Sequence, residues 1–509
     1  MTSSCDDGRA RHPFINFVDI STALRIRGIL LGWILFPIRA TLTTLFLLLM
    51  WPVARLRLAG LSEAERAVPV QGWRQWFFFP IMVFLSRAAY FCMGFLWIKV
   101  KGRQADLKEA PVLVVAPHST FLDMLVLPVT GLPTVVSRSE NIRLPVIGAL
   151  LEFNQAVMVN RKDPESRKKC VSQICERVTS DGRWPQMLMF PEGTTTNGRV
   201  LIKFKPGAFL AGVPVQPVLL HYPNNPDTVR WTWKGTTWLA ALWHTLSQLY
   251  TNVTVEFLPV YTPSEEEKDN PDVYAENVQK LMANALGVPA TDYVMDGRFP
   301  VRKLGGLSLP LESPAQETLR LLRRHGFTDA HVEALMNTMI DSCRSGQSTM
   351  VTADHLTSLL GLTDRITALK ICSLYSKDQT VDLKHVCVSV SAVSGFTSLE
   401  SLLHTVFTWY DSDDDGLLSS DDLSALMGVL VGVPQYDITE MYSALTSRGR
   451  PTEASLQNIL MTHPVYGKLL TDCLRFRGLT TADANHKGIV NGLNRGFYNG
   501  HKTNNHLMK

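Results

Sequence analysis

The spacing of apolar and polar positions divides the chain into parts of different character. Two nearly continuous apolar stretches, residues 28–54 and 76–100, precede short apolar runs that alternate with amphipathic segments. After residue 310 the apolar positions recur at helical spacing, and the end of the chain is polar and rich in Asn. We therefore expect a membrane-anchoring region (1–104), an α/β domain (105–300), an all-α domain (310–470) and a polar, disordered tail (471–509).

The two apolar stretches favour helices that enter a membrane, because a helix needs about 20 apolar residues to cross a bilayer. Pro37 and Arg39 leave the first stretch unbroken only over residues 40–53, whereas the second carries the charges of Arg87 and Lys99. Two spanning helices, or one span with a shallow hairpin, both fit this pattern, and two buried core helices are the alternative. Basic residues flank both stretches and therefore indicate no orientation.

An α/β fold with a largely parallel sheet is expected in the middle of the chain, because short apolar runs alternate there with helical segments. The helices are predicted at 164–179 and 271–286, and the second has Pro271 at its start and Gly287 just past its end. The strands are predicted at 111–117, 135–136, 156–159, 187–190, 213–220 and 253–260. The run at 213–220 would line a substrate groove or belong to the core.

His118 and Asp123 follow the first predicted strand and are five residues apart. In a continuous helix their side chains would be about 140° apart, so they meet only if His118 lies in the strand-to-helix turn and Asp123 in the first helical turn. Pro117 disfavours helix before this point, and Ser119 or Thr120 can cap the helix after it. Asp123 would then hold one ring nitrogen of His118 and leave the other free as a general base. A structural histidine is the alternative.

A second polar group follows the predicted strand at 187–190. Glu192 lies at the carboxyl end of this strand, where the sites of α/β proteins gather. Gly193 permits a close backbone approach, and Thr194 adds a hydroxyl donor. Backbone donors near Gly193 could stabilise an oxyanion.

Basic side chains supply candidate phosphate contacts. Arg161 follows the predicted strand at 156–159, where its guanidinium could hold a phosphodiester or pair with Asp163 on the surface. Lys203 and Lys205 flank Phe204 in a basic-aromatic patch that could meet a phosphate, although solvated lysines fit equally well.

Composition narrows the class of partner. Hydrophobic residues make up 46% of the 509 residues, which agrees with a membrane segment, and the net charge of +4 is too small to indicate nucleic acid. The 8 cysteines include no C-x-x-C pair, so reduced thiols in a chain that mostly faces the cytosol are expected.

These motifs come in the order and spacing of the four motif blocks of the glycerolipid acyltransferases. The wider sequence resembles the lysophosphatidylcholine acyltransferase family at 182–186, 205–209 and 231–233. The segments 137–141 and 145–151 look most similar to its lysophospholipid acyltransferase 4 branch, also called lysophosphatidylethanolamine acyltransferase 2.

The resemblance implies acyl transfer from acyl-CoA to a lysophospholipid such as lysophosphatidylethanolamine or lysophosphatidylcholine, in an endoplasmic reticulum membrane and without a cofactor. The lipid bilayer would be a further partner. The resemblance implies His118 and Asp123 as catalytic residues, and Arg161, Glu192, Gly193, Thr194 and Lys205 as substrate-binding residues.

One departure and two alternatives accompany the resemblance. Thr195 stands where many members carry a basic residue, which disfavours a phosphatidate-type substrate and fits a bulkier phosphodiester headgroup. Acylation of lysophosphatidate or glycerol-3-phosphate is one alternative function. A catalytically idle, calcium-responsive membrane adaptor is the other.

A calcium loop of the EF-hand type is predicted at residues 411–422. Gly416 would make its sharp turn, and apolar residues of two flanking helices surround it. Position twelve is Asp rather than the usual Glu, so weak calcium binding is expected, and a loop that folds without metal is the alternative. Residues 375–385 are expected to form a degenerate partner hand. The candidate ligands are Asp411, Asp413, Asp415, Leu417 through its carbonyl, and Asp422.

Overall fold

The computed structural model forms two compact units, residues 1–299 and 300–509, which are described separately. The tail predicted to be disordered lies outside the described residues from 478 onward, as does Arg161. The structure describes residues 12–18, 20–160, 163–296, 299–304, 307–311, 313–344, 348–376, 380–411, 415–432, 438–447 and 450–477.

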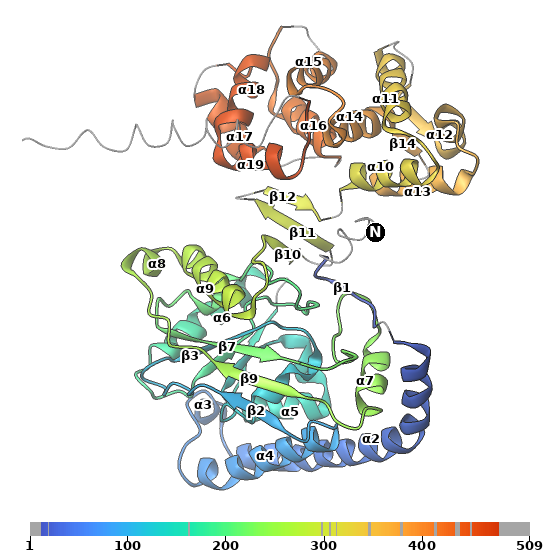
Figure 1. The fold of residues 1–509 in the computed structure, drawn as a ribbon. Helices are drawn as coiled ribbons and strands as arrows, with labels where there is room; N and C mark the ends of the chain where they lie inside the picture. The colour runs from blue at the N-terminus through green and yellow to red at the C-terminus, as the bar shows by residue number, and fades with distance from the viewer. Residues whose placement is uncertain are drawn as a thin grey trace, which may run out of the picture. The chain divides into compact units, whose positions relative to one another are not determined.

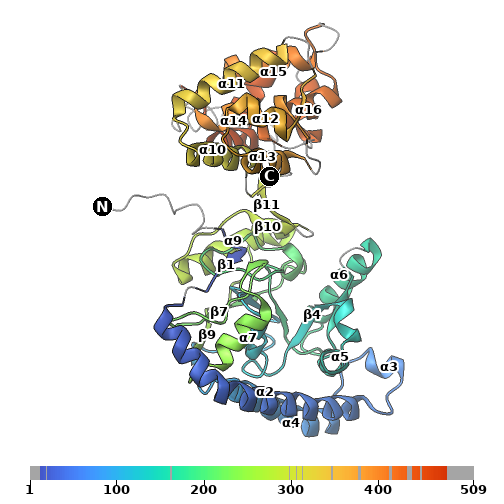
Figure 2. The ribbon, with the colours of Figure 1, turned by 90° about the vertical axis from the view of Figure 1, so that its right-hand side faces the viewer.

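Both apolar stretches form helices that are long and apolar enough to cross a membrane by length and composition. Helix α2 (Thr22–Leu58) continues through Pro37 and Pro52, and α4 (Trp73–Cys92) packs beside it after the short α3 (Glu63–Arg66). Figures 1 and 2 show the two long helices running together along one side of the first unit.

The second apolar stretch does not stay helical to its predicted end at residue 100. Helix α4 ends at Cys92, and Gly94 has a φ of 101°, in the left-handed region that ends a right-handed helix. Residues Ile98–Lys101 form strand β2, which pairs with β9. The expectation of one helical stretch over 76–100 is therefore wrong for its last residues.

A seven-stranded sheet organises the first unit, in the order β2-β9-β7-β3-β6-β4-β5. All neighbouring strands are parallel except β7 and β9, as the alternating pattern predicted. Its six strands besides β2 coincide with the predicted runs: β3 (Val112–Ala116), β4 (Thr134–Arg138), β5 (Val157–Val159), β6 (Met187–Met189), β7 (Val215–His221) and β9 (Val253–Phe257).

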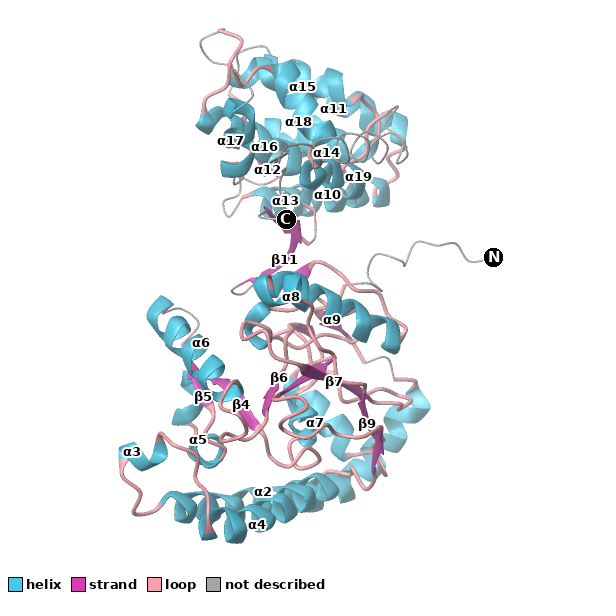
Figure 3. Cartoon of the chain, turned by 90° about the vertical axis from the view of Figure 1, so that its left-hand side faces the viewer, coloured by secondary structure: helices cyan, strands magenta, loops and turns pink. Residues whose placement is uncertain are grey.

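Helices cover both faces of this sheet. Alternate residues of a strand point to opposite sides, and here both sides carry buried apolar residues. Val112, Val114 and Ala116 of β3 pack with α6 and α9, whereas Leu113 and Val115 pack with η1, α7 and the end of α4. Figure 3 shows the strands between these helices. The bounds are α5 (Pro145–Phe153), α6 (Pro164–Val178), α7 (Trp238–Leu246), α8 (Glu265–Asp269), α9 (Pro271–Leu286), and the 3₁₀ helices η1 (Phe121–Val126), η2 (Ser139–Arg143) and η3 (Pro206–Ala208).

Short strands complete the first unit. Strand β1 (Ile15–Asn16) pairs in parallel with β8 (Lys234–Gly235), so the chain that precedes α2 lies against the connection between β7 and α7. Strand β10 spans Tyr293–Asp296.

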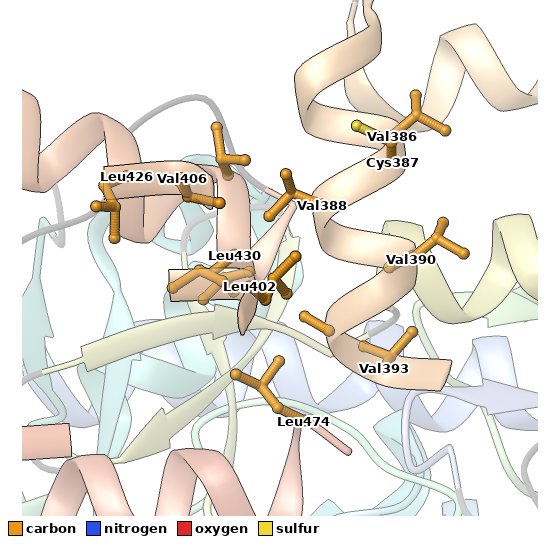
Figure 4. Packing of buried hydrophobic residues seen from close by; sticks show 14 of the residues in the cluster. Val386, Cys387, Val388, Val390, Val393, Leu402, Val406, Leu426, Leu430 and Leu474 are labelled. Atoms are coloured by element: carbon orange, nitrogen blue, oxygen red, sulfur yellow. The ribbon is translucent and has the colours of Figure 1, made fainter. Parts of the chain in front are cut away.

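The second unit is largely helical around one apolar core, part of which is shown in Figure 4. Leu402 and Val406 of α15 pack there with Leu426 and Leu430 of α16. Its helices are α10 (Pro314–Arg324), α11 (Asp329–Arg344), α12 (Ala353–Leu360), α13 (Arg365–Tyr375), α14 (Leu383–Ser394), α15 (Leu399–Tyr410), α16 (Ser420–Val431), α17 (Thr439–Ser447), α18 (Glu453–Thr462) and α19 (Pro464–Asp472).

The second unit also contains short strands, which corrects the expectation of an all-α domain. Strand β11 (Phe299–Leu304) pairs with β12 (Leu307–Pro310), and β13 (Met350–Thr352) pairs with β14 (Thr380–Asp382). The two pairs provide hydrogen-bond partners for the backbone N–H and C=O groups of segments between helices. Helical periodicity in the sequence does not predict such short strands.

The partner of the predicted calcium loop also differs from the expectation. Residues 380–382, within the expected partner segment, pair with β13 instead. In the 411–422 loop, the backbone N–H of Leu418 donates to the carbonyl of Pro451, 3.2 Å away, in the connection between α17 and α18.

Arg57 fastens the end of α2 to the rest of the first unit. Its side chain is buried, and its guanidinium donates to the carbonyls of Phe153 and Val70 and to Oε1 of Gln75. It also lies 4.4 Å from the centroid of the Phe153 ring. The guanidinium of Arg57 thus connects the end of α2 to α4 and α5.

Replacing Arg57 by Met should lower the melting temperature clearly, because each buried carbonyl left without a donor costs about 1–3 kcal/mol. Arg55→Met is the matched control: Arg55, in the same turn, makes an exposed ion pair with Glu152 at 2.6 Å, and such pairs contribute about 1 kcal/mol or less. Thermal unfolding in detergent measures both, and equal losses would contradict the role given to Arg57.

Candidate active site

His118 and Asp123 meet at the end of strand β3. The strand ends at Ala116, and Thr120 caps η1, so that Asp123 falls in the first turn of this 3₁₀ helix. Nδ1 of His118 lies 2.8 Å from Oδ2 of Asp123. This is the strand-to-helix geometry that their spacing required, although the turn is 3₁₀ rather than α-helical.

The Asp123 carboxylate is fully buried and accepts four hydrogen bonds. Besides His118, the backbone N–H groups of Ser119 and Thr120 donate to its Oδ2, at 2.7 and 3.0 Å. The hydroxyl of Tyr222 donates to its Oδ1 at 2.6 Å. An ionised carboxylate only accepts, so Nδ1 of His118 is assigned the proton and Nε2 retains a lone pair.

The imidazole of His118 is further held by its surroundings. The Phe190 ring stacks on it, with ring centroids 4.3 Å apart and planes at 30°. The backbone carbonyl of His118 accepts the N–H of Thr196 at 2.7 Å. The side chain of His118 remains 18% exposed, which leaves the imidazole open to a substrate.

Glu192 lies behind His118 and is almost fully buried. Its Oε1 accepts the backbone N–H of His118 at 2.7 Å, and its Oε2 accepts the Thr196 hydroxyl at 3.3 Å. Burial raises the pKa of Glu192 to about 8, against an ordinary value of 4.5. Burial therefore favours the protonated form of this carboxyl, compared with an exposed glutamate.

The other predicted substrate contacts are placed around Gly193. Gly193 has a φ of 65°, and a Cβ there would lie 3.2 Å from Nζ of Lys205, which is exposed. Thr194 is half-buried. The N–H of Gly193 donates to the carbonyl of Phe190 at 3.1 Å, so it is already engaged inside the turn.

The proposed basic-aromatic patch around Phe204 is not formed. Phe204 is buried in the core between the sheet and α9, on the opposite side of the segment from its two lysine neighbours. Lys205 is exposed and Lys203 is half-buried. Arg161, the other candidate phosphate contact, lies outside the described residues.

Three contacts around the site had no signal in local spacing. Tyr222 comes 99 residues after Asp123, and Phe190 is the last residue of the predicted strand at 187–190. Asn197 joins the loop after Glu192 to the N-terminal segment: its N–H donates to Pro13 and its side-chain amide to His12 and Ile15, at 2.7, 2.9 and 3.0 Å.

The predicted calcium loop is described in part, since Asp413 lies outside the described residues. Asp411 accepts the N–H groups of Asp415 and Gly416, at 3.2 and 2.9 Å, and Asp415 accepts that of Leu417 at 2.8 Å. Asp422 instead accepts the hydroxyl of Ser419 at 2.6 Å, in the capping box of α16. Within the described part of the chain no three His, Cys, Asp or Glu side chains are grouped to hold a metal.

The sequence of this chain is similar to those of known acyltransferases. An acyltransferase family model matches residues 97–221, which include His118, Asp123 and Glu192. The lysophospholipid acyltransferase LPCAT4 of Homo sapiens is 42% identical over 473 residues, which cover 91% of this chain and 89% of that protein. The chain belongs to the lysophosphatidylcholine acyltransferase family.

Lysophosphatidylcholine acyltransferase 2 of Homo sapiens is a further relative, 37% identical over 465 residues that cover 91% of this chain and 85% of that protein. Membership of the lysophosphatidylcholine acyltransferase family confirms the resemblance seen in the motifs and makes the chain an acyltransferase of lipid metabolism. A solved 1-acyl-sn-glycerophosphate acyltransferase, PlsC from Thermotoga maritima, is 16% identical with a TM-score of 0.36, and covers 52% of this chain and 97% of that one.

The contacts of Glu192 predict different outcomes for two substitutions. Glu192→Gln should keep most of the acyl transfer, because the amide oxygen still accepts the His118 N–H and glutamine resembles the protonated carboxyl. Glu192→Ala should reduce kcat by about tenfold or more, because it leaves a buried N–H without an acceptor. Initial rates with purified, folded variants measure both.

Glu267→Ala is the control for a general loss of stability. Glu267 is also a buried carboxylate, but it accepts the Tyr261 hydroxyl at 2.6 Å and caps α8. Acyl transfer by the folded fraction of this variant should stay near that of the native chain. If Glu192→Gln were as inactive as Glu192→Ala, the carboxylate itself would be needed.

Proposed function

We propose that this chain transfers a fatty acyl group from acyl-CoA to the free glycerol hydroxyl of a lysophospholipid, with His118 as the general base. The observation that carries the proposal is the buried Asp123 carboxylate on Nδ1 of His118, which leaves Nε2 as the proton acceptor. The printed names of its relatives, lysophospholipid and lysophosphatidylcholine acyltransferases, support this class of acceptor.

The reaction is a direct transfer in which every bond change is accounted for. Nε2 of His118 takes the proton of the glycerol hydroxyl while the oxygen attacks the thioester carbon. The tetrahedral intermediate then collapses, the carbon–sulfur bond breaks, and the CoA sulfur leaves with the proton returned by the imidazolium. Asp123 stabilises the imidazolium that forms between these steps, and the products are a phospholipid ester and free CoA.

The remaining predicted residues receive distinct roles in this proposal. Lys205 and Arg161 would bind phosphate groups of the substrates, and Thr194 would line the same side of the site. Gly193 allows the Lys205 side chain to lie across the turn. Glu192 would act by holding the backbone of His118, because both its oxygens are engaged inside the protein.

The acceptor is proposed to be lysophosphatidylethanolamine or lysophosphatidylcholine, and the site of action the endoplasmic reticulum membrane with most of the chain facing the cytosol. Helices α2 and α4, with their exposed apolar side chains, support attachment to a bilayer. Thr195 follows the Glu-Gly-Thr motif and favours an acceptor with a phosphodiester headgroup. The alternative reactions, acylation of lysophosphatidate or glycerol-3-phosphate, use acceptors with a phosphomonoester.

His118→Ala should reduce acyl transfer about a hundredfold or more, because the general base is lost. The assay uses purified protein in detergent with oleoyl-CoA and a panel of phosphodiester and phosphomonoester lysophospholipids. His404→Ala is the matched control, since His404 also faces a carboxylate, Glu453 at 3.1 Å, on the surface of the second unit.

Substantial turnover by His118→Ala would rule out the base assigned here. A native chain that transfers to phosphomonoesters in preference would favour the lysophosphatidate or glycerol-3-phosphate alternative. No transfer to any acceptor, with and without calcium, would favour the membrane adaptor.

We also propose that the 411–422 loop is a weak calcium site of the EF-hand type. Two features support a backbone shaped for such a site: the turn at Gly416, with a φ of 72°, and the hydrogen bonds that Asp411 accepts across the loop from the N–H groups of Asp415 and Gly416. The buried Leu418 anchors the loop to the core. Asp422 would have to leave its capping bond with Ser419 to reach an ion, which is one reason for weak affinity.

Asp422→Glu should tighten calcium binding about tenfold, because the longer side chain reaches the ion as a bidentate ligand. Asp421→Glu is the matched control, since Asp421 is exposed and occupies the neighbouring, non-ligating position. Calorimetric titration with calcium chloride measures the affinities. Absence of binding by both the native chain and Asp422→Glu at millimolar calcium would reject the site.

A further inference from the structure

We propose that Tyr222 is a positioning residue for acyl transfer, whose hydroxyl fixes the Asp123 carboxylate that in turn orients His118. This inference rests on the proposed function, in which His118 is the base. Tyr222 was not among the residues that the motifs indicated.

The register of the sheet explains why Tyr222 arrives at this place. Strands β3 and β7 are parallel neighbours, and Ala116 lies opposite Leu219. The residues after these strands therefore leave the same edge of the sheet together. His118 follows two residues after Ala116, and Tyr222 follows three residues after Leu219, so both reach the region of η1.

The hydrogen bonds of Asp123 show what Tyr222 contributes. Oδ2 already accepts His118, Ser119 and Thr120, whereas Tyr222 donates to the other oxygen, Oδ1, at 2.6 Å. The carboxylate is fully buried, so water cannot readily replace this donor. Two oxygens held from different sides fix the rotation of the carboxylate plane, and with it the orientation of the imidazole.

Tyr222 is suited to act as a donor and not as a base. Burial, and then the charge of Asp123, raise the pKa of Tyr222 well above its ordinary value of 10. The phenol therefore keeps its proton over the whole range in which an acyltransferase assay is run.

The ring of Tyr222 is itself held in place from the side of the long helices. It makes an edge contact with Phe95, with ring centroids 6.5 Å apart, and Phe95 is almost fully buried. Phe95 makes a similar contact with Tyr90 of α4, at 6.1 Å. The orientation of the hydroxyl is thus set by packing rather than by the hydrogen bond alone.

Tyr222→Phe removes the hydroxyl and keeps the ring, so it tests the proposal with little change in packing. We expect kcat to fall about 10- to 100-fold, the range for one hydrogen bond to a charged group, while the KM for oleoyl-CoA and for the lysophospholipid changes by less than about twofold. The acid limb of the kcat/KM profile should move to higher pH, because a carboxylate with one donor fewer attracts the imidazolium more strongly.

Tyr261→Phe is the matched control. Tyr261 also donates to a carboxylate, Glu267, over the same 2.6 Å, but at α8 and without contact to His118 or Asp123. It should lose similar thermal stability and keep the native kcat and pH profile. A purely structural role of Tyr222 would make the two variants alike.

A second measurement does not depend on turnover. The rate at which diethyl pyrocarbonate modifies His118, followed by peptide mass spectrometry, reports the protonation of its imidazole, and its pH midpoint should move upward in Tyr222→Phe only. An unchanged kcat with an unchanged midpoint would overturn the proposal, as would a loss caused by a raised KM alone. If the native chain transfers no acyl group but the midpoint still moves, the proposed function fails and the positioning role stands.

Discussion

A fully buried carboxylate, Asp123, is the constraint on which the site depends. Removing a charge from water costs several kcal/mol unless hydrogen bonds compensate it, and here His118, Tyr222 and two backbone N–H groups do so. To make these bonds, the end of β3, the first turn of η1 and the end of β7 must converge. The bond to Nδ1 leaves Nε2 as the ring nitrogen of His118 that does not face Asp123.

The rest of the first unit holds this convergence in place from several directions. Glu192 and Thr196 fix the backbone of His118, and Asn197 beside them binds the segment that leads into α2. The packing of Tyr222 on Phe95 connects the same centre to the end of α4. The helices expected to meet a membrane are therefore also connected to the scaffold of this site.

Local spacing predicted much of this arrangement. The six runs of apolar residues became strands of one sheet, and the distance from His118 to Asp123 in sequence led to the contact that the structure shows. Tyr222 could not be predicted in this way, because its approach depends on the register of β3 against β7, which no short segment encodes. The strand at 98–101 was hidden for a related reason: residues 93–97 connect it to the preceding helix, and Gly94 is the one residue of this connection that is not large and apolar.

The most direct test of the account is the acyl-transfer rate of Asp123→Asn. The amide has nearly the same size, but it carries no charge, and only one of its two polar atoms can accept. The account predicts a folded protein whose kcat is lower by about a hundredfold or more, because the imidazole loses both its orientation and the charge that stabilises its protonated form. A folded Asp123→Asn variant that keeps more than about a tenth of the native kcat would contradict the central role of this carboxylate.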